Sequence, residues 1–260
     1  MTELHTGAHP RVAGYRGKLS PKKGADKFNI GWAHDYLITP LPAPRYPIDV
    51  SYGITHWRML GNGPDPTCTV RPHGVGDCTF AGREHYKMAK AAAANISETW
   101  EDSNTLVEEY LAYDHGVDRG ANLADLLLTW YHAGKILAFA PVDYTNPQQC
   151  DSAMQAFNGL YVGVKLTDDA DELFTHHLQW TVADGQQPNP NELHCIVKVG
   201  SDGSSEDTWV TWGALQKSTL AWTSDCVDEA WVIITLEDRA NQVDMAKLRA
   251  DIEALEGQGG

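Results

Sequence analysis

The chain has 260 residues, 42% of them hydrophobic, which is enough to bury one substantial core. Its 35 acidic and 20 basic residues give a formal net charge of −15, which argues against a nucleic-acid partner and against adsorption to an anionic membrane. The sequence has no apolar run of membrane-spanning length and no basic-then-apolar signal-peptide pattern at its start. We therefore expect a soluble, cytoplasmic protein with one main domain.

Residues 1–70 are predicted to form an extended N-terminal arm. They are rich in glycine and proline and show little sustained periodicity. Such a segment cannot offset the entropy of its own ordering, so it should pack on the main domain or on a neighbouring molecule. The apolar residues that favour packing are Phe28, Ile30, Trp32, Tyr36, Leu37 and Ile38.

Basic residues are concentrated in the same arm, at Arg11, Arg16, Lys18, Lys22, Lys23 and Lys27. They suit an acidic partner surface, including that of a second copy of this chain. The alternative is a solvated arm with no partner. Both interpretations stay open.

Helices are predicted next along the chain. Residues 79–94 contain a string of alanines and a buried face, which places Cys78 at the first turn of a helix about four turns long. Further helices are expected at 103–113, with Asp102 or Ser103 as the cap, and at 122–132, ending before Gly134. A short fourth helix is expected at 147–157.

Strands dominate the second half of the chain. The first clear strand is 159–166; an acidic, polar stretch follows, and then strands at 193–199, 208–211 and 229–235. Helices followed by strands indicate an α+β domain, with the helices packed on an antiparallel sheet. The last segment, 236–260, is predicted to contain an amphipathic helix docked on the body or on a partner.

Five widely spaced cysteines, an odd number, are unlike the pattern of a secreted disulfide scaffold, so we expect reduced thiols. The sequence has no CxxC or HExxH motif, and we predict neither a metal nor a cofactor.

Cys78 is the sharpest functional candidate. It follows a glycine-rich turn, and the positive end of a helix together with an imidazole would lower the pKa of its thiol. His194, on a strand far downstream, is the candidate base. The plain alternative is a packed structural thiol, since free cysteine is among the most buried residue types. We expect Cys195 to face the core, together with four aromatic residues, Trp209, Trp212, Trp222 and Trp231.

Three motifs carry a resemblance to a known family. A cysteine at a helix start, His-Cys-Ile-Val-Lys-Val-Gly at 194–200 and Val-Thr-Trp-Gly at 210–213 are similar, in order and spacing, to motifs of the papain-like cysteine peptidases. Segments 209–216 and 228–232 also look like those of uncharacterised papain-fold proteins of phages and prophages. The resemblance implies a papain-like domain at 71–235 that attacks a peptide or amide through Cys78 and His194.

The sequence departs from that family at two positions. Val210 stands where those enzymes carry the asparagine that orients the histidine, and it cannot accept a hydrogen bond. Thr211 and Asp207 are the remaining candidates, although Thr211 is expected on the strand face opposite Val210 and would need a shift in register. The family's oxyanion-hole glutamine is also missing, which leaves His73 and the backbone N–H of Cys78 as donors.

Two functional hypotheses follow. The first is a thiol hydrolase of reduced activity that cleaves peptides or amides. The second is a catalytically silent structural protein of a phage-like particle, a capsid or tail component, whose arm and last helix bind other virion subunits or a second copy. A third option is that the arm is an inhibitory segment released by cleavage between residues 62 and 67.

Overall fold

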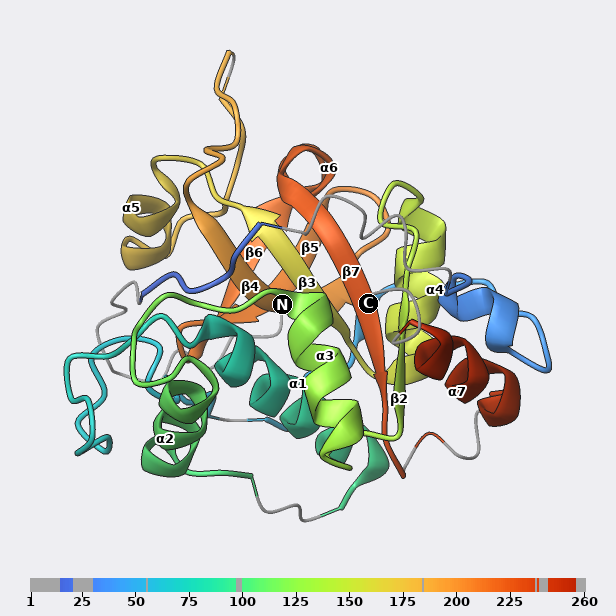
Figure 1. Cartoon of the computed structure of the whole chain (residues 1–260). Helices are drawn as coiled ribbons and strands as arrows, with labels where there is room; N and C mark the ends of the chain where they lie inside the picture. The colour runs from blue at the N-terminus through green and yellow to red at the C-terminus, as the bar shows by residue number, and fades with distance from the viewer. Residues whose placement is uncertain are drawn as a thin grey trace.

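The computed structural model describes residues 15–20, 30–54, 56–96, 100–183, 185–236, 238 and 243–255 (Figure 1). In chain order the elements are η2 (Ala33–Tyr36), β1 (Ile48–Asp49), α1 (Cys78–Ala94), α2 (Ser103–Tyr113), α3 (Leu123–His132), β2 (Ala138–Pro141), α4 (Pro147–Phe157), β3 (Leu160–Lys165), α5 (Ala170–Thr175), β4 (Leu193–Ser201), β5 (Glu206–Thr211), β6 (Ala214–Thr219), α6 (Leu220–Cys226), β7 (Val227–Ile234) and α7 (Met245–Ala254).

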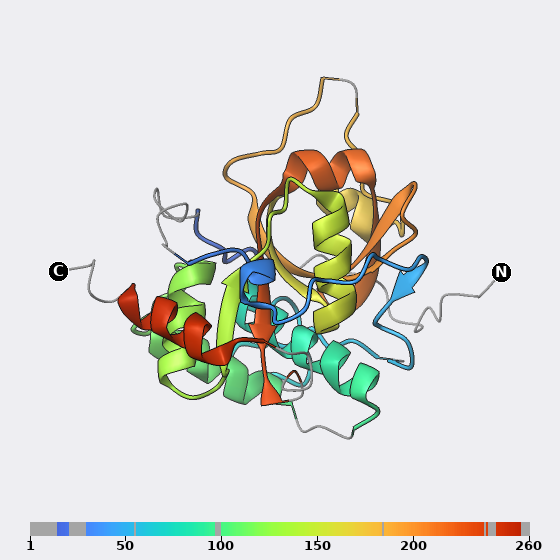
Figure 2. The same ribbon diagram turned by 90° about the vertical axis from the view of Figure 1, so that its right-hand side faces the viewer.

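The sheet has seven strands, with the order β2-β7-β3-β4-β5-β6, and β1 pairs with β4. All these neighbours are antiparallel, so the predicted α+β class with an antiparallel sheet is confirmed. In Figure 1 helices α1, α2 and α3 gather below the sheet. Figure 2 shows the curved orange strands around α4, which lies within their bend.

The four helices predicted ahead of the main strands are present, and their ends follow from local chemistry. The Asp102 carboxylate accepts hydrogen bonds from two backbone N–H groups at the start of α2, and Asn122 caps α3 in the same way. Helix α4 begins at Pro147, whose missing N–H is not needed in the first turn. Helices α1 and α4 each end at an asparagine, Asn95 and Asn158, in the left-handed conformation.

Six elements are absent from the predictions, and two of them, η2 and β1, are short elements within the arm. Strand β2 is short and almost entirely buried, so it lacks the alternating pattern that marks a half-exposed strand. Strand β6 carries mostly polar side chains at a sheet edge. Helices α5 and α6 have six and seven residues, which is too short for a clear helical period.

The described part of the arm packs on the chain's own body. Ile30 and Tyr36 are buried, whereas Trp32 and Ile38 are exposed, and Phe28 lies outside the described residues. The Tyr36 hydroxyl donates to Asp251 on α7 at 2.8 Å. Helix α7 in turn buries two of its own side chains, Leu248 and Ile252, so η2 and α7 support each other.

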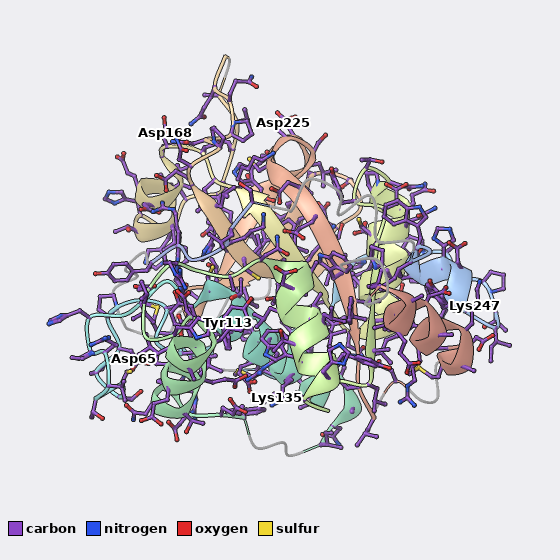
Figure 3. All side chains as sticks on the ribbon, in the orientation of Figure 1. Asp65, Tyr113, Lys135, Asp168, Asp225 and Lys247 are labelled. Carbon is purple, nitrogen blue, oxygen red and sulfur yellow. The ribbon has the colours of Figure 1, made fainter. Side chains whose placement is uncertain are left out.

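The four tryptophans predicted to be core residues are all buried. Four charged residues, Asp168, Asp225, Lys135 and Lys247, are exposed at the periphery (Figure 3). In the part of the chain that the structure describes, no helix has the length and apolarity needed to cross a membrane.

Candidate active site

Cys78 is the first residue of α1 and is 1% exposed. The turn before it needs glycine, because Gly74 has φ +93° and a Cβ there would lie 2.6 Å from the backbone of Gly63. The N–H of Cys78 lies in the first turn, where a helix supplies no acceptor of its own. Thus the glycine-rich turn brings α1 into the body with its cysteine innermost.

Helix α1 approaches strands β3 and β4 closely at its first two turns. The Tyr161 hydroxyl donates to the carbonyl of Thr79 at 2.8 Å. A Cβ at Gly82 would lie 3.0 Å from the sulfur of Cys195, so a larger residue would push the helix away. The backbone N–H of Cys195 also acts to lower the pKa of the Cys78 thiol. That amide belongs to the peptide bond that joins Cys195 to His194, which places the candidate thiol beside this part of β4.

His194 is fully buried and its Nε2 lies 2.7 Å from the hydroxyl oxygen of Thr211. The register explains this partner. Val210 pairs with Val197, three residues beyond His194, so Val210 faces the opposite side of the sheet from the imidazole. The next residue, Thr211, therefore shares the face of His194. The expectation that Thr211 would need a shifted register is wrong, because it assumed that Val210 faces the histidine.

Trp212 covers the imidazole. Thr211 pairs with Ala214, so Trp212 and Gly213 form a two-residue hairpin turn, and their φ values of +44° and +70° are those of a type I′ turn. The indole stacks on the His194 ring with 4.7 Å between centroids and 28° between planes. The Trp-Gly pair of the sequence motif is thus the turn that holds one face of the histidine, a role that the prediction of a core aromatic missed.

The structure places the other orienter candidate, Asp207, away from His194. Its carboxylate lies 2.8 Å from the Lys198 ammonium and accepts from Thr223 at 2.7 Å. Lys198 also binds Asp151 at 2.7 Å, so Asp207 belongs to a buried ion cluster. The reason is position: Asp207 pairs with Ser201, near the far end of β4 from His194. His73, the candidate oxyanion donor, is exposed in the turn before α1.

Residues 15–20 of the arm cover the thiol. The N–H of Gly17 donates to the sulfur of Cys78 at 3.3 Å, and the carbonyl of Gly17 accepts from Ala121 at 2.6 Å. Asn62, which sequence reasoning did not single out, donates from its buried amide to the carbonyl of Tyr15 at 2.8 Å. In Figure 1 this dark blue segment crosses in front of the strands.

Two of the arm's basic residues pair with acidic residues of the same chain. Arg16 lies 2.5 Å from Asp171 and 2.6 Å from Glu192, and its guanidinium lies 5.9 Å from the centre of the Trp212 ring. Lys18 contacts the adjacent carboxylates of Asp228 and Glu229. The acidic surface predicted for a partner is therefore supplied here by the chain itself. The other four basic residues, Arg11, Lys22, Lys23 and Lys27, lie outside the described residues.

The covered site favours uncharged groups. Burial raises the pKa of the Cys78 thiol to about 12, and the neighbouring Asp77 acts in the same direction. Burial also lowers the pKa of His194 well below its usual range, with Arg16 and His85 as further causes. The sequence-based expectation of a lowered thiol pKa does not hold in this conformation, because desolvation outweighs the backbone N–H groups of Cys195 and Gly17.

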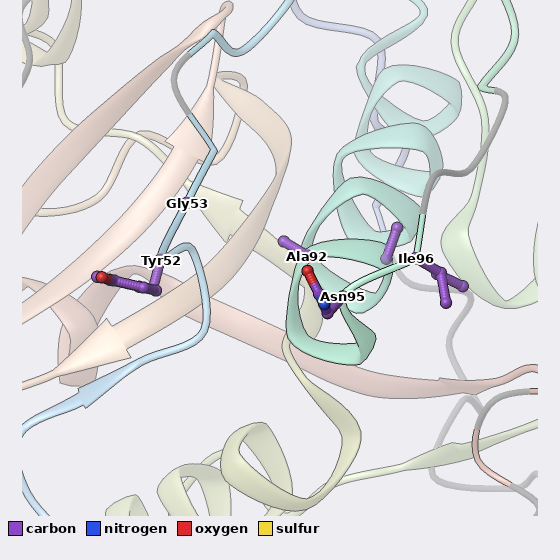
Figure 4. Close-up of a pocket in the computed structure, with 6 residues that line it drawn as sticks. Tyr52, Gly53, Ala92, Asn95 and Ile96 are labelled. Atoms are coloured by element: carbon purple, nitrogen blue, oxygen red, sulfur yellow. The ribbon is translucent and has the colours of Figure 1, made fainter.

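Neither a metal site nor a disulfide is found among the described residues: they contain no group of three or more His, Cys, Asp or Glu arranged to hold a metal ion, and all five cysteines are free. An open hollow lies between the Tyr52–Gly53 turn and the last turn of α1, at Ala91, Ala92, Asn95 and Ile96 (Figure 4). Since α1 has 17 residues, this hollow lies roughly 25 Å from Cys78. It is not part of the thiol site.

Comparison with solved structures identifies the fold. The chain is similar to xylellain, described as a cysteine protease from Xylella fastidiosa, with a TM-score of 0.58 and 13% sequence identity over 89% of this chain and 100% of that chain. At this identity the likeness shows the fold alone, which is the papain-like α+β fold that the motifs predicted. No protein-family model matches the sequence, and no curated protein matches it. The resemblance to phage proteins stays a prediction.

Proposed function

We propose that this chain is a papain-like thiol hydrolase that cleaves peptides or amides, with Cys78 as nucleophile and His194 as base. The observation that carries the proposal is the hydrogen bond between His194 and Thr211. It occupies Nε2 of the buried ring, whereas Nδ1 has no hydrogen-bond partner among the described residues. A histidine held by one nitrogen and a cysteine at a helix start are two of the parts that nucleophilic thiol catalysis requires, which supports the proposal.

In this mechanism Nε2–H donates to Thr211, and Nδ1 accepts the thiol proton of Cys78. The thiolate sulfur attacks the carbonyl carbon of the substrate amide, and the N–H of Cys78 stabilises the developing oxyanion. The C–N bond breaks as the imidazolium returns its proton to the leaving amine nitrogen, which leaves a thioester on the sulfur. His194 then deprotonates a water molecule, whose oxygen attacks the thioester carbon. The C–S bond breaks, the acid is released and the imidazolium returns its proton to the sulfur.

The arm keeps this site inactive until it moves. The N–H of Gly17 is hydrogen-bonded to the Cys78 sulfur. In this conformation the Cys78 thiol and the His194 imidazole are both buried, which favours their uncharged forms. Release of the arm would hydrate the thiol and remove Arg16 from His194, and both changes favour the thiolate–imidazolium pair. The blocking segment is 15–20, so a cleavage between residues 62 and 67 is not needed to expose Cys78; movement of a short stretch is enough.

The second candidate function is a catalytically silent papain-fold protein that serves as an assembly subunit, for example of a phage-like particle. One observation favours it: burial raises the pKa of the Cys78 thiol to about 12, and the buried carboxyl of the adjacent Asp77 acts in the same direction. A cysteine in that environment is inert. The two candidates differ in whether Cys78 becomes reactive once the arm is displaced.

The test is alkylation of Cys78 by iodoacetamide across pH 5–9, followed by mass spectrometry. It uses a variant in which one added methyl group displaces the arm. A Cβ at position 17 would lie 1.2 Å from the carbonyl oxygen of Gly76, so Gly17→Ala displaces the segment. The matched control is Ser20→Ala, an exposed position of the same segment.

We expect Gly17→Ala to react at Cys78 at least ten times faster than the wild type at pH 7, with a plateau that extends below the ordinary thiol pKa of about 8.5. Adding His194→Ala should abolish that plateau. A thiol that stays inert in Gly17→Ala, or titrates identically with and without His194, would favour the silent assembly protein.

A further inference from the structure

Lys18 of the arm fills a closed acidic pocket next to the thiol. Its side chain is 0% exposed, and its ammonium nitrogen lies 2.9 and 3.1 Å from the two carboxylate oxygens of Asp228 and 3.1 Å from Glu229. Both carboxylates are themselves 8% exposed. Lys18 directly follows Gly17, whose N–H contacts the Cys78 sulfur, so the pocket lies one residue from the thiol along the bound chain.

A bulge in β7 brings the two carboxylates together. Gly163 of β3 pairs with Glu229, and the next residue, Val164, pairs with Val227, so Asp228 is an extra residue on β7. Adjacent residues of a regular strand face opposite sides, whereas a bulge redirects one of them. Because of the bulge, Asp228 and Glu229 both reach the same ammonium group.

Gly163 provides the space for the lysine side chain. A Cβ at this position would lie 2.2 Å from Cε of Lys18 and 2.6 Å from Cγ of Glu229. Glycine weakens a strand interior, so its presence within β3 calls for a close approach of another group. Here that group is the occupant of the pocket, and any larger residue would fill the pocket itself.

We propose that Asp228, Glu229 and Gly163 form the specificity pocket for a lysine or arginine side chain of the peptide substrate, and that Lys18 is its internal occupant. This inference rests on the proposed hydrolase function. Apart from Lys18, Asp228 lies 3.9 Å from the ammonium of Lys165, whose side chain is 41% exposed. Two buried carboxylates that lose their buried cation are strongly unfavourable, so the pocket selects a basic side chain over an apolar or acidic one. The substrate class is therefore a basic peptide.

The surroundings support the same class. Arg16, on the other side of Gly17, meets Asp171 and Glu192, whose side chains are 42% and 32% exposed. Acidic side chains thus pair with the residues on both sides of Gly17, the residue that contacts the thiol. Exposed Asp168 and Asp225 lie near the upper ends of the strands in the view of Figure 3. Such a field draws a basic peptide toward the cleft.

The pocket is tested by binding, without catalysis, in the full chain carrying Cys78→Ala and Lys18→Ala. The probes are three fluorescein-labelled pentapeptides that differ only in a central lysine, norleucine or glutamate, measured by fluorescence anisotropy. Norleucine keeps the apolar stem of lysine and removes the charge. The control protein carries Cys78→Ala and Lys217→Ala, since Lys217 pairs with Glu206 elsewhere on the sheet and leaves Lys18 in the pocket.

We expect the lysine peptide to bind the Lys18→Ala protein at least tenfold more tightly than the norleucine and glutamate peptides, and the control protein to bind all three weakly. Adding Asp228→Asn with Glu229→Gln should reduce the preference to less than twofold. Gly163→Ala, a second variant that keeps both carboxylates, should weaken binding of the lysine peptide at least tenfold. Equal binding of the three peptides, or a preference that survives both changes in a folded protein, would overturn the proposal.

A parallel assay separates this inference from the proposed function. Coumarin amides of the same peptides are offered to a protein that carries Gly17→Ala and Lys18→Ala with Cys78 intact, because Gly17→Ala displaces the segment that covers the thiol. Cleavage of the lysine substrate at least tenfold faster than the others supports both statements. Cleavage without preference overturns the pocket and leaves the hydrolase. Selective binding of the lysine peptide with no cleavage of any substrate supports the pocket and refutes the hydrolase.

Discussion

The hydroxyl of Thr211 lies 2.7 Å from Nε2 of His194, on the strand next to the histidine's own. Val210, the apolar residue that precedes it, pairs with Val197 on the other face of the sheet. A threonine therefore holds the imidazole at the place where the sequence motif shows only a valine, and this contact leads to the first prediction.

Replacing Thr211 by valine should lower the reactivity of Cys78 by about 10–100-fold, because Nε2 loses the partner that orients the ring. We would measure the alkylation rate at pH 7 in the Gly17→Ala background. Thr211→Ser, which keeps the hydroxyl, is the matched control and should retain most of the rate. Equal rates for the valine and serine variants would show that Thr211 has no positioning role.

Asp207→Asn should destabilise the protein without affecting the thiol. It weakens the buried cluster with Lys198 and Asp151, so the free energy of unfolding should fall by on the order of 2 kcal/mol in urea titrations. Glu206→Gln is the control, because its pair with Lys217 is partly exposed and should contribute about 0–1 kcal/mol. A change in the alkylation profile of Cys78 on Asp207→Asn would instead connect Asp207 to His194.

The protein should lose stability as the pH falls below about 6.5, the ordinary histidine pKa. Burial lowers the pKa of His85 to about 4 and that of His194 well below its usual range. Below pH 6.5 the unfolded chain therefore binds protons that the folded chain does not, and each imidazole removes about 1.4 kcal/mol per pH unit.

Urea unfolding at pH 7, 6 and 5 measures this effect. His85→Gln removes one of the two imidazoles and should reduce the slope by about 1.4 kcal/mol per pH unit between pH 6 and 5. Its amide can still donate toward the carbonyl of Arg58, which the His85 ring nitrogen contacts at 2.8 Å. An unchanged slope would mean that His85 is already protonated in the folded state.

Arg16→Gln should raise the pKa of His194, because the guanidinium is the first cause, after burial, of its lowering. The titration of the ring, followed by NMR of ¹³C-labelled histidine, should move toward the ordinary value of about 6.5. Lys217→Ala, which removes a positive charge elsewhere on the sheet, should leave the titration midpoint of His194 unchanged. The same midpoint in both variants would exclude Arg16 as a cause.

Local sequence patterns were enough to predict the helical half, the antiparallel sheet and the position of Cys78. The helix from Cys78 to Ala94 depends on its alanine string, and a glycine-rich turn before it is visible in the sequence. The strand that carries His194 is rich in apolar and β-branched residues. These features depend on neighbours a few residues apart, and such interactions are the ones that propensity and periodicity describe.

Tertiary structure decided which residue contacts His194 and which residue fills the acidic pocket beside the thiol. A one-residue difference in strand register determines whether Val210 or Thr211 faces the imidazole, and sequence spacing does not contain that information. Lys18 and Glu229 are 211 positions apart, yet a bulge and a glycine bring them into contact. Burial, set by the whole fold, then moves the pKa of Cys78 upward, against the direction that its place at a helix start suggests.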